Sequence, residues 1–244
     1  GVGLGETHGL GRVQQAGQIE GRLGFVMMVA AQVDGHFRRF RLLAVLAEDS
    51  GQAPGQLVQA LAHHALFLLQ GQHGLPGQVA VHGQLLAGLK NYAEDFSPAE
   101  NESLMLVGNA GLGKTHAALA IAGIVLDKGC DVIYVSSPDF FGKMEASRFD
   151  PSGDADTLLR TAATADLLIL DDLGTEFVTP YFITTFYSLL NNRLGAGLPT
   201  IVTTNITDGS LLEKRYTEKI SSRLSAFVPF NFVGEDIRAQ KASE

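Results

Sequence analysis

The sequence predicts an α/β fold in which short buried strands alternate with helices and assemble into a parallel sheet. An apolar run at 103–107 leads through a glycine-rich turn into an apolar-faced helical pattern at 116–126. Further apolar runs at 131–135, 165–174 and 199–204 have the length and residue types of buried strands. Strands and helices that alternate in this way are typical of α/β domains.

The turn after the first strand fits the phosphate-binding pattern GxxxxGK[ST]. Glycines let backbone N–H groups converge on phosphate oxygens, and the following helix adds a partial positive charge at its N-terminus. The pattern predicts that Lys114 reaches the β- and γ-phosphates of ATP and that the Thr115 hydroxyl ligates Mg²⁺. The alternative, a turn that binds nothing, is disfavoured by the flanking strand and helix. The candidate loop consists of Gly108, Asn109, Ala110, Gly111, Leu112, Gly113, Lys114 and Thr115.

A short helix is predicted just before the first strand, over residues 86–96. Leu86, Leu89, Tyr92 and Phe96 fall on one side of it. Because it lies just before the first strand, this helix is placed to form one side of the pocket for the adenine ring of a nucleotide. The same periodicity is equally well explained by core packing, so both interpretations stay open.

Aromatic residues follow the second strand in a short amphipathic helix that Pro138 begins. Phe140 and Phe141 next to Lys143 have the composition of a surface that stacks on single-stranded bases. Phenylalanine is more often buried than exposed in proteins, and this tendency favours a place in the core for Phe140 and Phe141.

Two carboxylates, Asp171 and Asp172, end the apolar strand at 165–174. They lie at the carboxyl end of a strand, where α/β sheets place their ligands. A buried strand that ends in two acids needs a cation or polar partners nearby. We therefore expect Asp171 near Mg²⁺ and Asp172 orienting a water molecule. The alternative is that both acids cap the next turn.

Three more residues are candidates for contact with the transferring phosphoryl group. Asn205 follows the strand at 199–204, where its amide is placed to hydrogen-bond a water or the γ-phosphate, although Asn there is often a turn former. Arg223 lies on a predicted helix, and Arg238 lies near the end of the chain. Each arginine is either a surface residue or a planar cation for the phosphoryl group.

The composition of the 244 residues limits the classes of function. The net charge of −8 gives no global basic field, so nucleic acid would have to bind a local patch. A lone Cys130 excludes an internal disulfide and agrees with a cytoplasmic location. The longest apolar stretches are too short for a membrane span, and we expect no secretory leader, since no charged-then-apolar pattern opens the sequence.

The composition changes abruptly near residue 90. Before it there is no Lys, Asn or Tyr, while eleven of the twelve Gln and six of the seven His lie there. Helical spacing is plausible at 40–47 and 57–69, and glycines divide the rest. Three interpretations remain for residues 1–85: a small helical partner-binding domain, a poorly ordered tail, or sequence outside the native reading frame. We treat 1–85 as an appendage and 86–244 as the ATPase domain.

Six segments of residues 86–244 together resemble the DnaC-type replicative helicase loaders of the AAA+ class. They are GNAGLGKTH, LLILDDLGTEF, NNRL, PTIVTTN, KISSRL and FVGEDIR, in this order. The resemblance implies a three-layer P-loop fold with a five-stranded parallel sheet, its last strand at 226–232. It matches Asn205 to sensor 1, Arg223 to an arginine finger that acts on a neighbouring subunit, and Arg238 to sensor 2.

The resemblance also implies a function and partners. The protein would form a homo-oligomer and deliver a replicative DNA helicase to single-stranded DNA, and its ATP state would control this delivery. No membrane partner is expected. The related IstB-like transposition ATPases have a similar loop, although the DDLG, TTN and SRL forms are closer to the loaders. A small-molecule kinase and an adaptor with little turnover are two further candidate functions. Nothing in 1–85 resembles the loaders' helicase-binding domain, so helicase loading is inferred from the ATPase half.

Overall fold

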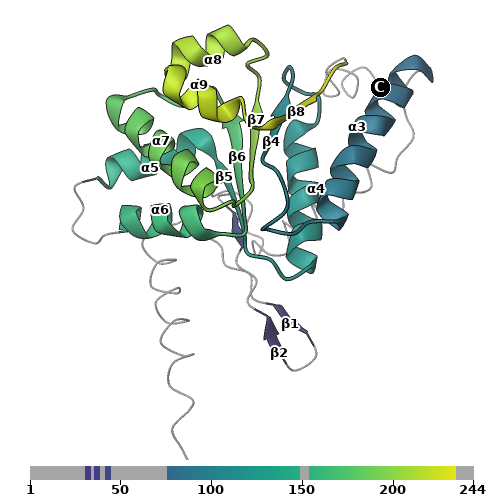
Figure 1. Ribbon diagram of the computed structural model, residues 1–244, viewed down its shortest axis with the longest axis horizontal. Coiled ribbons are helices and arrows are strands. Elements are labelled where there is room, and N and C mark those ends of the chain that lie inside the picture. Colours follow the sequence, from purple (N-terminus) through teal and green to yellow (C-terminus); the bar gives the residue numbers. More distant parts are fainter. Residues whose placement is uncertain (1–30, 34–35, 39–41, 45–75, 149–153, 235–244) are drawn as a thin grey trace, which may run out of the picture.

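A parallel sheet forms the centre of the molecule (Figure 1). In this computed structural model the described residues are 31–33, 36–38, 42–44, 76–148 and 154–234. Every pair of neighbouring strands in the central sheet is parallel. In spatial order the strands are β3 (Leu42–Ala44), β5 (Val132–Ser136), β6 (Leu167–Leu173), β7 (Thr200–Thr204), β4 (Leu104–Val107) and β8 (Val228–Asn231).

The five strands expected between residue 103 and residue 232 are confirmed, each to within a few residues. β3 adds a further strand at the edge, where it pairs with β5. The helical expectation at 40–47 is therefore wrong for residues 42–44. A three-residue apolar run fits either state, and an open sheet edge offers it hydrogen-bonding partners. The expected helix at 57–69 lies outside the described residues.

Helices cover both faces of the sheet, which gives the three layers expected from the sequence (Figure 1). On one side lie α3 (Pro76–Glu94) and α4 (Lys114–Asp127). On the other lie α5 (Ser137–Ala146), α6 (Asp154–Thr164) and α7 (Pro180–Gly195). Two short helices, α8 (Gly209–Tyr216) and α9 (Glu218–Leu224), sit beyond the carboxyl ends of the strands. None of the described helices is long and apolar enough to cross a membrane.

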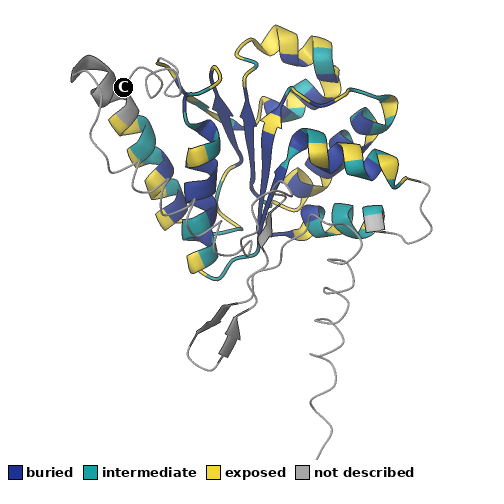
Figure 2. Cartoon of the chain, turned by 180° about the vertical axis from the view of Figure 1, so that it is seen from behind, coloured by how far each residue is buried: buried dark blue, intermediate teal, exposed yellow. Residues whose placement is uncertain are grey.

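Alternation along the strands divides the core in two, since successive side chains point to opposite faces of a sheet. In β6, Leu167 and Ile169 pack in the cluster with α3 and α4, whereas Leu168 and Leu170 pack in the cluster with α5 and α7. The four inner strands β4, β5, β6 and β7 are almost entirely buried (Figure 2). This two-sided burial is why each strand reads as a continuous apolar run.

Phe140 and Phe141 belong to the core, as predicted from the general tendency of phenylalanine to be buried. Both are buried, and Phe141 makes an edge contact with Phe182 at 4.6 Å between ring centroids. These rings hold α5 against α7, and they are not exposed for stacking on bases.

The helix predicted at 86–96 begins earlier, at Pro76, and ends at Glu94. Leu89 and Phe96 are buried beside α4, so the core-packing interpretation holds for them. Lys128 donates hydrogen bonds to the carbonyls of Glu94 (2.6 Å) and Phe96, and so ties the end of α3 to the end of α4. α3 thus forms part of the α/β domain and begins before the predicted boundary at 85/86.

Arg193 lies fully buried near the end of α7. It connects this helix to the end of α6 and to the beginnings of β6 and β7, at the amino ends of the strands. Its guanidinium donates to the carbonyls of Ala162, Ala165 and Pro199 and to the hydroxyl of Thr200. Burial lowers the pKa of Arg193 to about 10, which still leaves it charged at neutral pH. Hydrogen bonds to carbonyl and hydroxyl oxygens compensate the cost of burying this cation, so we assign Arg193 a role in stabilising the fold.

Candidate functional site

The glycine-rich turn between β4 and α4 has the backbone that a phosphate-binding loop needs. Gly111 and Gly113 have φ values of 77° and 89°, in the left-handed region that glycine adopts without strain. Gly113 caps α4, and Lys114 is the first residue of that helix. The loop therefore lies at a helix N-terminus, where backbone N–H groups have no intrahelical partners and attract anions.

Gly108 begins the loop at a point where no side chain fits. Its φ is 155°, and a Cβ atom there would lie 2.4 Å from the carbonyl oxygen of Phe232. The Gly108 N–H also donates to the Thr204 carbonyl at 3.2 Å. The loop thus leaves the sheet in close contact with both neighbouring strands, β7 and β8.

Gly108→Ala should therefore destabilise the fold, by about 1–3 kcal/mol, because a backbone atom and not a flexible side chain opposes the new methyl group. Urea unfolding would measure this loss. Gly142→Ala is the matched control: Gly142 is exposed in α5 with open space around it, and alanine there should stabilise the helix slightly. Equal effects of the two substitutions would contradict the prediction.

Lys114 and Asn205 come together although ninety-one positions separate them in the chain. The Lys114 ammonium is almost fully buried, and its Nζ donates at 2.7 Å to the carbonyls of Gly108 and Asn109 and to Asn205 Oδ1. Parallel β4 and β7 are neighbours, and so their carboxyl ends meet at the same edge of the sheet. The cation and amide predicted to contact phosphate thus lie at one site.

Asp171 faces α4, because it shares the side of β6 on which Leu167 and Ile169 lie. Its buried carboxylate accepts hydrogen bonds from Thr115 Oγ1 at 3.1 and 3.2 Å. Tyr134 OH and Thr203 Oγ1 also donate to it, each at 2.5 Å. Burial, followed by the charge of Asp171, raises the pKa of Tyr134 above its usual value, and so the phenol remains a donor. Thr115 and Asp171, predicted from distant segments, are brought into contact.

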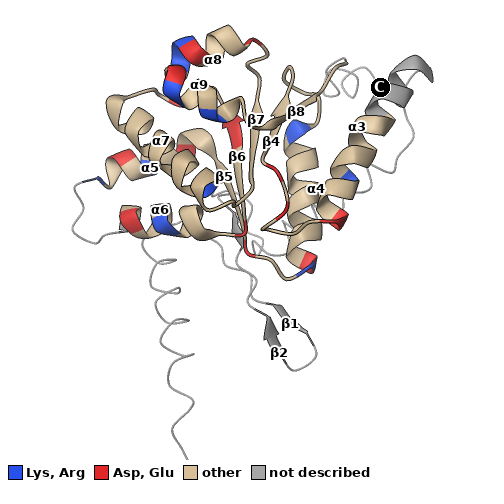
Figure 3. Cartoon of the chain, viewed as in Figure 1, with Lys and Arg blue, Asp and Glu red and all other residues tan. Residues whose placement is uncertain are grey.

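This pair has the chemistry of a magnesium site. Mg²⁺ is usually held in proteins by one or two carboxylates together with phosphate oxygens and water. Asp171 supplies a carboxylate, Thr115 supplies a hydroxyl, and the loop supplies a place for phosphate beside both. Figure 3 shows charged positions near the carboxyl ends of the strands, basic at the start of α4 and acidic at the end of β6. The residues present therefore fit an ATP–Mg²⁺ complex.

Asp172 is presented at the sheet edge by an irregular backbone. The pairing of β6 with β7 shifts register between Leu170 and Leu173, and Asp172 has a φ of 57°, rare for a residue with a side chain. Its N–H donates to Thr203 Oγ1 at 2.9 Å, while its side chain is exposed. Bulges of this kind often re-aim a side chain next to an active site. Asp171 is turned inward and Asp172 outward, as their separate predicted roles require.

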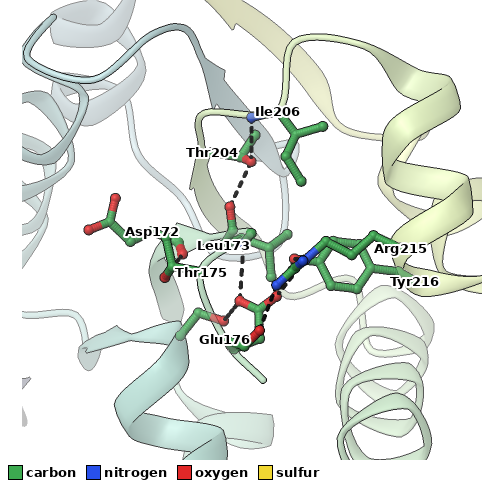
Figure 4. Close-up of polar contacts among 10 residues, drawn as sticks. Asp172, Leu173, Thr175, Glu176, Thr204, Ile206, Arg215 and Tyr216 are labelled. Atoms are coloured by element: carbon green, nitrogen blue, oxygen red, sulfur yellow. Dashed lines mark hydrogen bonds and ion pairs between the residues drawn. The ribbon is translucent and has the colours of Figure 1, made fainter. Parts of the chain in front are cut away.

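Glu176 is a buried carboxylate with no role predicted from the sequence (Figure 4). It accepts hydrogen bonds from Ser137 Oγ and the Gly174 N–H, both at 3.0 Å, and from Tyr216 OH. Arg215 pairs with it at 3.4 Å and also donates to its backbone carbonyl at 2.6 Å. Burial, and then the charge of Glu176, raises the pKa of Tyr216. Glu176 thereby fastens α8 to the loop that follows Asp172.

The two predicted arginines have different outcomes. Arg223 lies in the last turn of α9, and its described contacts are with Tyr187 and Asn191 of α7 and with Lys219, not with the phosphate loop. Arg238 lies outside the described residues. The structure therefore brings together the loop, Asp171, Asp172 and Asn205 but leaves Arg223 on a separate surface.

Three residues around the site, Thr203, Tyr134 and Glu176, were not predicted from the sequence. Thr203 stands in the TTN segment close before the predicted Asn205, and Tyr134 is a hydroxyl in an otherwise apolar strand. A polar group within a buried run is itself a signal, since it requires a partner. Glu176 follows the strand-end acids by a few positions, but only its distant partners on α8 show that it is buried.

The fold and the glycine-rich loop define the chain as a P-loop protein of the AAA+ type. Comparison with known families gives the more specific result: the family described as IstB-like ATP binding protein matches residues 86–214. The chain belongs to this family. The family resemblance inferred from the sequence motifs is thus confirmed.

Curated relatives include replicative helicase loaders. The chain is 26% identical over 161 residues to the replicative helicase loader DnaC of Escherichia coli K12, which is 64% of this chain and 65% of that protein. It is 28% identical over 137 residues to the loader DnaI of Bacillus subtilis, covering 56% of this chain and 42% of that protein. The chain thus spans less than two thirds of the length of these relatives.

Solved structures have the same fold. The crystal structure of the DnaC helicase loader matches with a TM-score of 0.59 at 22% identity, covering 68% of this chain and 96% of that chain. The replication initiator DnaA bound to AMPPCP and single-stranded DNA matches with a TM-score of 0.55 at 19% identity, covering 66% of this chain and 50% of that chain. At these identities the likeness supports the fold alone.

Proposed function

We propose that this protein is an ATPase that delivers a replicative DNA helicase to single-stranded DNA under the control of its ATP state. The observation that carries the proposal is one composite site. A buried lysine, a sensor-like asparagine and a threonine–aspartate pair meet at the carboxyl edge of a parallel sheet, in a chain whose relatives include helicase loaders. We assign these roles to residues 86–244 and propose that 1–85 is an appendage, apart from β3 and the first part of α3, which join the α/β domain.

Each residue has a role that follows from its position. Loop N–H groups and Lys114 hold the phosphates, and Thr115 with Asp171 holds Mg²⁺, which supplies charge stabilisation at the phosphoryl oxygens. Asp172 is exposed at the edge and orients the attacking water, together with Asn205. A neighbouring subunit of a homo-oligomer supplies Arg223. Arg238 is proposed as a further phosphate contact.

A transposition helper is the second candidate, and the comparisons give it specific support. The family itself is named for IstB, and an insertion-sequence protein of Mycobacterium tuberculosis, named as ATP-binding, is 31% identical over 104 residues. That match covers 43% of this chain, against 64% for the E. coli loader. The longer coverage favours the loader.

The test is delivery of a helicase to single-stranded DNA fixed on beads, with the replicative helicase of the same organism. With ATP, the full chain should increase the amount of helicase retained on the DNA. Asp172→Asn should still bind ATP, because Lys114, Thr115 and Asp171 remain, but should hydrolyse it slowly and stay on the helicase.

Two results would overturn the loader function. Stimulation of an insertion-sequence transposase, with no effect on the helicase, would favour the transposition helper. Helicase delivery that is equal with and without ATP, together with no measurable turnover, would favour an adaptor in which nucleotide only fixes shape.

A further inference from the structure

Arg223 is held by a small platform on the surface of α7. Its guanidinium carbon lies 4.2 Å from the centre of the Tyr187 ring. Nη2 donates to Tyr187 OH at 2.7 Å and to Asn191 Oδ1 at 2.9 Å, and Nε donates to the same amide oxygen at 3.2 Å. A further bond joins Nη1 to the Lys219 carbonyl at 3.1 Å. Stacking and directed hydrogen bonds together fix the plane and the direction of this side chain.

The platform fits the helical geometry of α7. Tyr187 and Asn191 are four residues apart and so lie on the same side of the helix. Asn191 is exposed, whereas Tyr187 and Arg223 are half-buried. The assembly therefore lies at the surface, within reach of another molecule.

The partners of Arg223 within the described part of the chain are all neutral. A phenol, an amide and a backbone carbonyl orient a guanidinium without cancelling its charge. Arg215 on the adjacent helix shows the opposite arrangement, since it pairs with the carboxylate of Glu176 at 3.4 Å. Among the described residues no carboxylate forms an ion pair with Arg223. An arginine that is held in place but keeps its full charge suits the binding of an external anion.

We propose that Tyr187 and Asn191 are positioning residues that hold Arg223 ready for the nucleotide of a neighbouring subunit. This inference rests on the proposed function, because it requires the site to be shared between two subunits. Tyr187, Asn191 and Arg223 belong to the same subunit, so the platform orients the arginine that this subunit donates to its neighbour. The described polar contacts of Arg223 are with α7 and Lys219 and do not include the phosphate loop of its own subunit.

This placement makes a specific prediction for the double variant Tyr187→Leu, Asn191→Ala. Its kcat for ATP hydrolysis should fall by about a hundredfold, because small misplacements of a catalytic group cost rates of that order. Its KM for ATP should stay close to that of the unaltered protein. Asn191→Ala alone, at an exposed position, gives a test that does not depend on the half-buried ring.

Mixing experiments separate positioning from a general loss of structure. Mixed with Lys114→Ala, the double variant should recover activity, because the Lys114→Ala subunit still donates a well-held arginine. Mixed with Arg223→Ala, it should not recover, because neither subunit donates one. A merely structural defect would not distinguish these two partners.

Asn192→Ala is the matched control, since Asn192 is the exposed neighbour of Asn191 on α7 and should leave kcat unchanged. Tyr187→Phe keeps the ring and should lose less activity than Tyr187→Leu. An unchanged or increased kcat in the double variant, or recovery with Arg223→Ala, would overturn the platform while leaving the shared site intact. Failure of Arg223→Ala and Lys114→Ala to complement each other would overturn the shared site and the platform with it.

Discussion

Replacing Lys114 by alanine should abolish tight binding of ATP. Lys114 is a buried cation at the end of the loop, and its ammonium donates at 2.7 Å to the loop carbonyls of Gly108 and Asn109 and to Asn205 Oδ1. Removing one partner of a buried, hydrogen-bonded charge pair typically weakens binding by about two to three orders of magnitude. Titration calorimetry with ATP and Mg²⁺ measures the affinity directly.

Lys90→Ala is the charge-matched control for this experiment. Lys90 is exposed on α3, where it pairs with Glu94 at 3.5 Å. Its removal changes the net charge by the same amount but should leave ATP affinity unchanged, since exposed ion pairs contribute little. Unaltered affinity in Lys114→Ala, in a protein that still melts cooperatively, would remove the phosphate-loop assignment.

The parts of the site that could be predicted from the sequence are those governed by local rules. The strand, loop and helix around Lys114 follow from apolar periodicity and from the glycines that the turn requires. Asp171 was predicted as a strand-end acid. Its contact with Thr115 follows from alternation along β6, which turns that carboxylate towards α4.

The remaining parts depend on contacts between distant segments. Glu176 meets Ser137, Arg215 and Tyr216 from separate parts of the chain, and no spacing in the sequence encodes that meeting. The same holds for β3, which takes its strand state from the exposed edge of β5. Tertiary context decides such elements, because a short apolar run fits either a helix or a strand.

Besides their buried apolar residues, helices α8 and α9 have polar contacts with two other parts of the domain, the loop after β6 and α7. Glu176 joins α8 to the loop that follows Asp172. Tyr187 and Asn191 hold the end of α9 on α7. A displacement at the end of β6 would therefore be carried to α8 through the ion pair between the buried Glu176 and the partly exposed Arg215. Because α8 and α9 are joined directly at Thr217, the displacement would also move the segment that carries Arg223.

Arg223→Ala should lower the rate of ATP hydrolysis by about three to five orders of magnitude, the range that an arginine near the γ-phosphate contributes in related phosphoryl transfers. ATP affinity should change little, because the described contacts of Arg223 lie on α7 and not in the loop. Turnover measured at saturating ATP gives the rate, and calorimetry gives the affinity. A matching loss in both would indicate that the arginine acts within its own subunit or supports the fold.

The dependence on protein concentration decides whether the arginine acts between subunits. A shared site forms only on association, so the specific ATPase activity of the unaltered chain should rise with concentration and then level off. Arg223→Ala and Lys114→Ala should each be nearly inactive, while their mixture should recover activity, because some interfaces then pair an intact loop with an intact arginine. Specific activity that is constant over the whole concentration range, with no recovery on mixing, would rule out the shared site and leave Arg223 as a residue that acts within its own subunit or supports the fold. In the second of these cases, its stacking on Tyr187 would serve to hold α9 on α7.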